Sequence, residues 1–336
     1  MKRSILSVIG ALAGTALLFG TSACSSTASA EPAPVPTTQT AGAFPRTIVV
    51  DGADMTIAEQ PQRVLAISSD VADVALQLIG PERMIAVPQY IHSEFTSTQS
   101  KLAVQVENAL SSSTGADPEQ FLALDPDLVL VTTRHTSEED AFSMLEQAGI
   151  PTVAVHNGWD SPDLYRENVR LLGDVLGAED EAQQLIEQFD ARTQAVTDAV
   201  ASLSDEEKPL TIVLRYLGAN PYLSGPGSIS YTTLLAAGAR SGTDVLGMEK
   251  TGQASTEQLI SAAPTHLVLL DSSGEGIAQF AEILDHPGMQ AVPAVAQDNI
   301  LILPSATLST GSGALHGLEA IASWLHPELI SAGTGR

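Results

Sequence analysis

The chain has 336 residues, more than one hydrophobic core usually supports, so two domains are expected. Its composition is that of a globular protein, with 44% hydrophobic and 16% charged residues. The formal net charge of −25 argues against nucleic acid or an anionic lipid surface as a partner, because both would repel the chain.

The segment 1–23 has the layout of a secretory signal peptide. Two basic residues precede an apolar run from Ile5 to Gly20, which is short for a membrane span, and small residues then lead to Cys24. This cysteine is the single one in the chain, so no second cysteine exists to form a disulfide with it. The setting resembles a bacterial lipobox, although Thr21 stands where an aliphatic residue is usual. We therefore predict a signal peptide over residues 1–23 and a lipid anchor at Cys24, on the extracytoplasmic face of the cell membrane.

Residues 24–46 are rich in Ser, Thr, Ala and Pro without apolar periodicity, which predicts a flexible stalk. From residue 47, short apolar runs alternate with helical patterns, and one helix ends near Gly80. This alternation predicts a parallel, doubly wound α/β lobe over residues 47–160. The strands expected in it are Arg63–Ser68, Met84–Val87, Asp127–Val131 and Thr152–Val155.

The next segment, residues 161–206, contains no strand-like run. A helix from about Glu179 to Leu203 would be roughly 37 Å long at ~1.5 Å per residue, enough to cross between two lobes. Strand–helix alternation then resumes and predicts a second α/β lobe over residues 207–336. The predicted fold class is thus α/β, with two doubly wound lobes joined by a single long helix and a ligand cleft between the lobes.

One short unit occurs twice in the chain, as PEQFLALDPDLVLV from Pro118 and as TEQLISAAPTHLVLL from Thr256. Each unit reads as a short helix followed by a buried strand, and each has a glutamate at its second position, Glu119 and Glu257. A glutamate in the first turn of a helix is favoured by the helix dipole, so one alone would indicate little. Two at matching places in two lobes favour a shared function.

The order of these segments resembles the substrate-binding proteins of ABC importers that carry ferric siderophores, haem or cobalamin. The resemblance covers about residues 47–330 and rests on RVLAISSDVADVALQLIG, PEQFLALDPDLVLV, QAGIPTVAV, the long helix, GPGSISYTTLLAAGA and TEQLI, in that order. It implies two lobes joined by one rigid helix, a ligand in the cleft, and no enzymatic activity. It also implies an ABC permease with its ATPase as partners, docked through Glu119 and Glu257.

Residues that follow strands are the candidates for ligand binding, because open α/β sheets bind ligands beyond the carboxyl ends of their strands. Arg134 and Arg215 favour an anionic ligand met by guanidinium groups, although each could instead pair with a nearby acid. Tyr231 follows the glycine-rich GPGSIS and could stack on a ligand or donate a hydrogen bond. The full candidate set is Tyr90, His92, Arg134, His135, Trp159, Arg215, Tyr216 and Tyr231.

A small-molecule iron complex, a ferric siderophore, is the expected ligand, because it needs no protein–iron bond and suits an Arg and Tyr lining. No cofactor is expected. Haem is the alternative: some haem carriers of the family hold iron between a His of the first lobe and a Tyr of the second, which implies His135 and Tyr231 here. Thr233 departs from that pattern, since it offers no cation to lower the pKa of the phenol. A cobalamin carrier is a further alternative.

Overall fold

The structure is a computed structural model. It describes residues 43–50, 52–111, 118–132, 136–155, 157, 159, 161–309 and 311–333. The predicted signal peptide, Cys24, Arg134 and His135 lie outside the described residues. Within these ranges, no helix combines the length and the apolar character needed to cross a membrane. The described chain opens with an antiparallel pair of strands, β1 (Arg46–Val50) and β2 (Ala53–Ile57).

The first lobe is built on a five-stranded sheet in which every pairing is parallel, with strand order β5-β4-β3-β6-β7. Its strands are β3 (Val64–Ala66), β4 (Met84–Pro88), β5 (Asn108–Leu110), β6 (Leu128–Thr132) and β7 (Thr152–Val155). Its helices are α1 (Ser69–Ile79), η1 (Gln89–His92), α2 (Ser100–Ala103), α3 (Pro118–Ala123) and α4 (Thr136–Gln147). Every residue of β6 and β7 is buried, as the unbroken apolar runs predict for a sheet covered on both faces.

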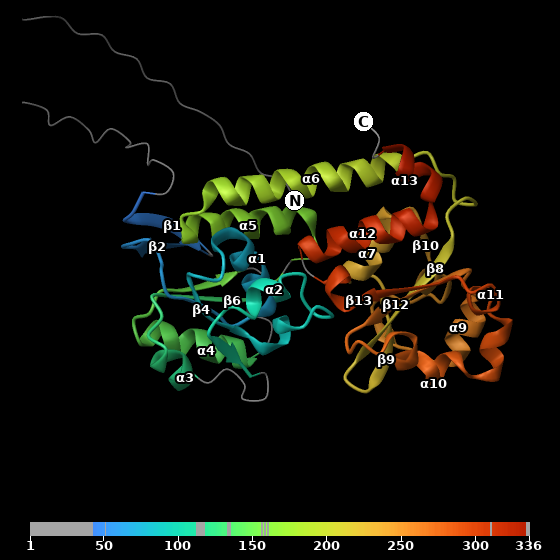
Figure 1. The fold of residues 1–336 in the computed structure, drawn as a ribbon, viewed down its shortest axis with the longest axis horizontal. Coiled ribbons are helices and arrows are strands. Elements are labelled where there is room, and N and C mark those ends of the chain that lie inside the picture. Colours follow the sequence, from blue (N-terminus) through green and yellow to red (C-terminus); the bar gives the residue numbers. More distant parts are fainter. Residues whose placement is uncertain are drawn as a thin grey trace, which may run out of the picture. The chain divides into compact units, whose positions relative to one another are not determined.

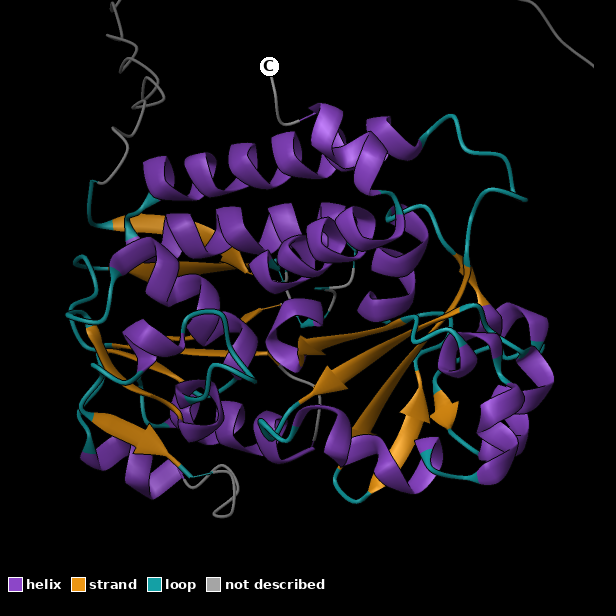
Figure 2. Ribbon diagram, turned by 45° about the vertical axis from the view of Figure 1, so that its right-hand side comes forward, coloured by secondary structure: helices purple, strands orange, loops and turns teal. Residues whose placement is uncertain are grey.

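The second lobe has a mixed sheet of order β11-β9-β8-β12-β13, with β10 paired to β8. The pairs of β8 with β12 and of β12 with β13 are parallel, whereas β9 runs antiparallel to β8 and to β11. Figure 2 shows helices on both faces of this sheet. Its strands are β8 (Leu210–Leu217), β9 (Asn220–Leu223), β10 (Arg240–Ser241), β11 (Gly252–Gln253), β12 (His266–Asp271) and β13 (Ile300–Pro304). Its helices are α7 (Ile229–Ala236), α8 (Gly242–Val245), α9 (Thr256–Ala262), η3 (Gly276–Phe280), α10 (Ala281–Leu284), η4 (Pro287–Ala291), α11 (Pro293–Ala296), η5 (Ser305–Leu308), α12 (Ser312–Leu325) and α13 (Pro327–Gly333).

Two helices connect the lobes, α5 (Pro162–Leu176) and the 22-residue α6 (Glu179–Val200). At ~1.5 Å per residue α6 is about 33 Å long, and Figure 1 shows it running above both lobes. The predicted long helix is therefore confirmed. The side chains of Tyr165 and Phe189 join α5 to α6, with ring centroids 4.4 Å apart. Arg192 of α6 forms a two-pronged ion pair with Glu319 of α12, at 2.8 and 2.6 Å, so α6 is fastened to the second lobe as well.

The sequence repeat is a structural repeat. The first residues of α3 and α9 are as far apart in the sequence as the first residues of β6 and β12. The turn between helix and strand also repeats, because Asp125 and Ala263, which hold matching places in the two units, both have positive φ angles, of 51° and 45°. In each lobe the repeated strand lies between the lobe's first strand and its last. The two lobes thus share a scaffold, and their carboxyl-terminal strand ends can be compared position by position.

Candidate ligand-binding site

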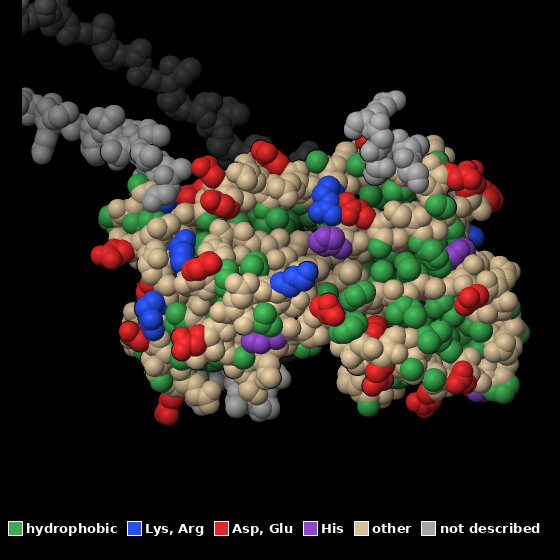
Figure 3. Space-filling view, in the orientation of Figure 1, with side chains coloured by type: hydrophobic (Ala, Val, Ile, Leu, Met, Phe, Trp, Pro, Cys, Tyr) green, Lys and Arg blue, Asp and Glu red, His purple; other side chains and the backbone are tan. Residues whose placement is uncertain are grey.

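A cavity of about 510 Å³ lies between the lobes. Figure 3 shows the surface hollowed between the two lobes on the side away from α6. The first lobe lines the cavity with Ser69, Asp70, Asp73, Tyr90 and Thr96. The second lobe lines it with Arg215, Tyr216, Leu217, Gly218, Ile229, Leu270, Ser272, Ser305, Leu308 and Ser309.

Most of these residues lie near or just after the carboxyl end of a strand. Ser69 follows β3, Tyr90 follows β4, and Ser305 follows β13. This is the edge at which open α/β sheets bind ligands. The volume also falls within the range of about 300–1,000 Å³ that is usual for small-molecule sites. The position and size of the cavity are therefore those of a ligand site.

Arg215 is the cation of this cavity. It lies on β8, in register with Leu270 of β12 and Tyr222 of β9. Its Nε is buried and makes no hydrogen bond to any described residue. Burial lowers the pKa of Arg215, and the interaction with Tyr90 of the first lobe opposes that shift. A half-buried guanidinium whose Nε has open donor capacity suits a ligand that brings anionic or carbonyl oxygens.

The first-lobe wall carries two buried carboxylates, Asp70 and Asp73, in the first turns of α1. Asp70 accepts a hydrogen bond from the Thr132 hydroxyl at 3.0 Å, and Asp73 accepts one from Ser97 at 2.6 Å. Burial raises the pKa of Asp73 to about 7; the Ser97 hydrogen bond lowers it and the charge of Asp70 raises it further. Near neutral pH, Asp73 is thus protonated in a large fraction of molecules, which reduces the negative charge that an anionic ligand would meet.

Beside the cavity, the lobes also touch without the help of α6. The backbone N–H of Ala306 donates to the carbonyl of Phe95 at 2.9 Å, which ties the loop before α2 to η5. The Phe95 ring lies over Gly274, so close that a Cβ there would be 2.9 Å from the ring. Thr96 and Ser305, which neighbour these contacts in sequence, both line the cavity. Separation of the lobes at this point would therefore change the shape of the site.

The other predicted site residues lie elsewhere. The Tyr231 phenol donates to both oxygens of Asp244 on α8, at 3.0 and 3.2 Å, and Tyr231 does not line the cavity. His92 ends η1 and does not line it either, and its Nε2 is buried. Three of the eight candidates, Tyr90, Arg215 and Tyr216, are brought together, while Arg134 and His135 lie outside the described residues.

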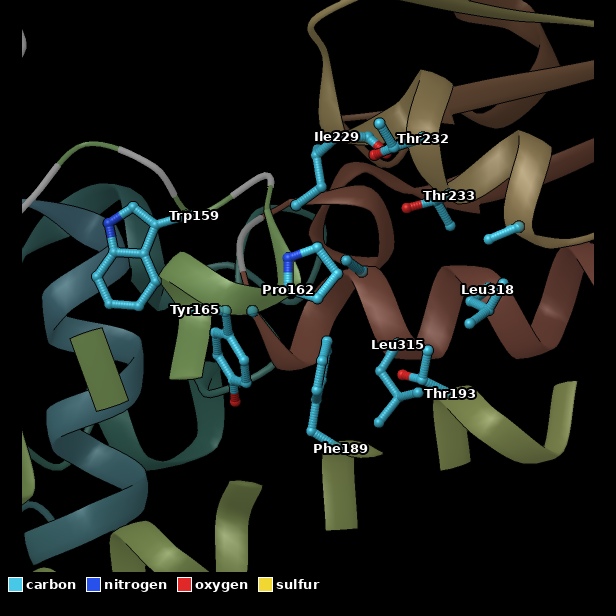
Figure 4. Close-up of a pocket in the computed structure, with 13 residues that line it drawn as sticks. Trp159, Pro162, Tyr165, Phe189, Thr193, Ile229, Thr232, Thr233, Leu315 and Leu318 are labelled. Carbon is cyan, nitrogen blue, oxygen red and sulfur yellow. The ribbon is translucent and has the colours of Figure 1, made fainter. Parts of the chain in front are cut away.

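Trp159 lines a second, smaller cavity of about 100 Å³. Figure 4 shows this apolar recess between α7, α12 and the connecting helices, with Tyr165 and Phe189 among its walls. Ile229 lines both cavities, so the recess lies directly behind the cleft. Trp159 is 4% exposed, and its Nε1 donates to the Thr132 hydroxyl at 3.4 Å. Its position is that of a core residue that supports the cleft from behind.

Sequence reasoning missed several lining residues. Asp73 lies one turn inside α1, and Thr96 lies in the loop that follows η1, so neither directly follows a strand. Ser305, Leu308 and Ser309 follow the strand NILILP, and the strand-end rule that identified Arg215 would have identified them too.

As for metals, no group of three or more His, Cys, Asp or Glu side chains able to hold an ion occurs in the described part of the chain.

The two repeated glutamates do not line the cavity, and they lie at matching structural positions. Glu119 and Glu257 occupy the first turns of α3 and α9, and both side chains are exposed. Figure 1 shows α3 and α9 on the side of the sheets that faces away from α6. Ser255 caps α9 in a capping box with Gln258.

Comparison with known proteins identifies the family. A family model described as "Periplasmic binding protein" matches residues 64–307, so the chain belongs to this family of binding proteins and is not an enzyme. The chain is 21% identical over 290 residues to an uncharacterized ABC transporter substrate-binding lipoprotein, YvrC, of Bacillus subtilis strain 168. That alignment covers 85% of this chain and 87% of the relative. Together these matches make the chain an ABC-transporter substrate-binding protein.

Solved structures agree on the fold. The apo form of the periplasmic haem-binding protein RhuT from Roseiflexus sp. RS-1 superposes with a TM-score of 0.65 at 20% identity. The superposed region covers 79% of this chain and 99% of the RhuT chain. A structure from Saccharomonospora viridis DSM 43017, described as an ABC-type Fe³⁺-hydroxamate transport system, gives a TM-score of 0.61 at 24% identity. The superposed region covers 84% of this chain and 100% of the S. viridis chain. The prediction of two α/β lobes joined by a long helix is confirmed.

Proposed function

We propose that this protein captures a ferric siderophore in the cleft between its lobes and delivers it to an ABC permease. The observation that carries the proposal is the half-buried Arg215 guanidinium, which lines the cavity near the end of β8 and interacts electrostatically with Tyr90 of the first lobe. Siderophore complexes present oxygen-rich, often anionic surfaces, which guanidinium, phenol and hydroxyl groups can bind without a protein–iron bond. The lining supplies such hydroxyls at Ser69, Ser272 and Ser305. The similarity in fold to an Fe³⁺-hydroxamate transport protein supports the same class.

Haem is the second candidate. The similarity in fold to the haem-binding RhuT favours it. The predicted pair of iron ligands was His135 and Tyr231, but the Tyr231 phenol hydrogen-bonds Asp244 instead of lining the cleft. Haem would thus need another axial ligand or a rearranged α7, and for this reason we place it second.

The test uses soluble protein lacking residues 1–24, titrated with a ferric hydroxamate, a ferric catecholate and haem. We expect intrinsic fluorescence quenching and a raised melting temperature with one siderophore class, and no Soret band after haem is added. Arg215→Ala should weaken that binding roughly 10- to 100-fold, the cost of losing a charged hydrogen bond. Arg240→Ala is the matched control, because the exposed Arg240 side chain does not line the cavity and its Nε donates to the Lys208 carbonyl. If Arg215→Ala binds the siderophore with wild-type affinity, Arg215 does not contribute to the binding site.

We further propose that Glu119 and Glu257 dock the loaded protein on positive pockets of the permease. Both are exposed acids at matching positions of the two lobes, and neither lines the cavity. Glu119→Lys with Glu257→Lys should leave siderophore affinity unchanged but abolish most uptake, because reversed charges repel the pockets. Paired titration of soluble protein and uptake by cells carrying the variants checks this. Normal uptake by the double variant would reduce the repeat to a folding unit used twice.

Membrane attachment is proposed through a lipid at Cys24, as the lipobox-like sequence suggests. The YvrC relative is itself described as a lipoprotein. Cys24→Ser should release the protein into the medium or leave it with its signal peptide attached. Mass spectrometry of the N-terminal peptide distinguishes these results from a processed, lipid-bearing chain, which would contradict the proposal.

A further inference from the structure

The two repeated helices share an exposed apolar residue as well as an exposed acid. Leu122 of α3 and Ile260 of α9 are among the large hydrophobic side chains that remain exposed, and each is 38% exposed. Leu122 and Ile260 are as far apart in the sequence as Glu119 and Glu257, and as the strands β6 and β12. The two lobes therefore leave a large apolar side chain partly open to solvent at the same position of the repeat.

Each helix is anchored by its opposite face. Phe121 of α3 is 4% exposed, and Leu259 of α9 is 0% exposed, so the residue just before each exposed apolar side chain holds its helix to the lobe. The glutamate and the apolar residue are three positions apart, which places them on one face of a helix. Each lobe thus presents a pair made of one acid and one apolar side chain, Glu119 with Leu122 and Glu257 with Ile260.

We propose that Leu122 and Ile260 are the apolar half of a contact that is made twice, once by each lobe, with the two membrane subunits of the permease. The proposal rests on the proposed function, which supplies the permease as partner. Two matching patches within one chain fit a partner that itself presents two matching surfaces, and both helices lie on the side facing away from α6 (Figure 1). The acids require a cation on each subunit, and the exposed apolar side chains require an apolar recess beside it. Protein interfaces bury apolar side chains at their centre and keep polar and charged groups at the rim, and an apolar residue next to an acid fits this arrangement.

The experiment measures binding of soluble protein, loaded with its siderophore, to nanodiscs that contain the permease and its ATPase. Leu122→Ser and Ile260→Ser should each weaken binding by about threefold to sixfold, because a partner covers only the part of the side chain that is still exposed. The double variant should lose roughly 10- to 30-fold, since the two patches are separate. Siderophore affinity should stay close to that of the wild type, because neither residue lines the cavity.

Val245→Ser is the matched control, because Val245 is 60% exposed but lies on α8, outside the repeat. It should bind the nanodiscs like the wild type. Wild-type binding by the double Ser variant, while Glu119→Lys with Glu257→Lys fails to bind, would overturn the apolar contact alone. Failure of the wild-type protein to bind the permease at all would overturn the permease assignment, and the apolar contact with it.

Discussion

The two lobes share a scaffold, yet each contains a buried carboxylate, Asp73 in α1 and Asp271 at the end of β12, and the two have opposite environments. In the first lobe, burial raises the pKa of Asp73 to about 7. In the second, burial also raises the pKa of Asp271, but backbone N–H groups of Gly276, Ser273 and Gly274 donate to it and lower the pKa below its usual value. Near pH 7, Asp73 is thus partly protonated, whereas Asp271 is held charged. Burial raises the pKa of both carboxyl groups, and the hydrogen-bond donors that reach each group decide which one stays charged.

This difference has a consequence for ligand binding. The Asp271 carboxylate accepts hydrogen bonds from the backbone of its own loop, and these bonds hold the loop in a compact turn around Ser272 and Gly274. Asp73 has one hydrogen-bond donor among the described side chains, Ser97, and it faces the cavity. The second-lobe wall therefore meets a ligand with the positive charge of Arg215, and the first-lobe wall meets it with a carboxyl group whose charge depends on pH.

The largest effect should come from removing the carboxylate of the first lobe. Asp73 has a folded-state pKa near 7 and an unfolded value near 3.8, so wild-type stability should fall as the pH rises from about 4 to about 7. Asp73→Asn removes that penalty and keeps an oxygen that accepts from Ser97. We expect a gain in the free energy of unfolding of roughly 2–4 kcal/mol at pH 8 and almost none at pH 4. Urea titrations at several pH values measure it, and an equal gain at all pH values would refute the ionisation argument.

Replacing the buried carboxylate of the second lobe should change the stability in the opposite direction. Asp271 has a lowered pKa in the folded state, so it stabilises the fold above pH ~4, and this contribution is lost as the pH falls through its folded-state value. Asp271→Asn should cost about 1–3 kcal/mol at pH 7, because charged acceptors of backbone N–H groups are lost. The cost should shrink under acidic conditions. If both Asn variants shift stability in the same direction at pH 7, the contrast between the lobes is wrong.

Most of the fold could be predicted from local patterns in the sequence. The apolar runs that became β6 and β12, and the stripe that became α6, depend on periodicity within a few turns, so the sequence was sufficient to predict them. The antiparallel strands β9 and β11 were missed, because they are short and carry no clear alternation.

The site was harder to predict, because it depends on packing between segments distant in sequence. Arg215 and Tyr90 were found by the strand-end rule, which follows from topology alone. Tyr231 has the same kind of glycine-rich lead, but the packing of α7 against α8 sets its direction, and there it meets Asp244. Asp73 was overlooked for a similar reason, since its exposure to the cleft depends on which face of α1 the second lobe leaves uncovered.

The smallest effect concerns the place where the two walls touch, Gly274 under the Phe95 ring. Gly274 has a φ of +85°, so an alanine there suffers backbone strain and also pushes on the ring, 2.9 Å from the new Cβ. Gly247→Ala is the matched control, because Gly247 has a φ of +65° but nothing within 4 Å of the added atom. We expect Gly274→Ala to lower the free energy of unfolding by about 0.5–1 kcal/mol more than the control, a modest excess because an aromatic ring edge can shift. It should also weaken siderophore binding slightly, since displacement of Phe95 loosens its bond to Ala306 beside the cavity. Equal losses of stability in the two variants would mean that the Phe95 contact contributes nothing to holding the lobes together, and that the connecting helices alone set their distance.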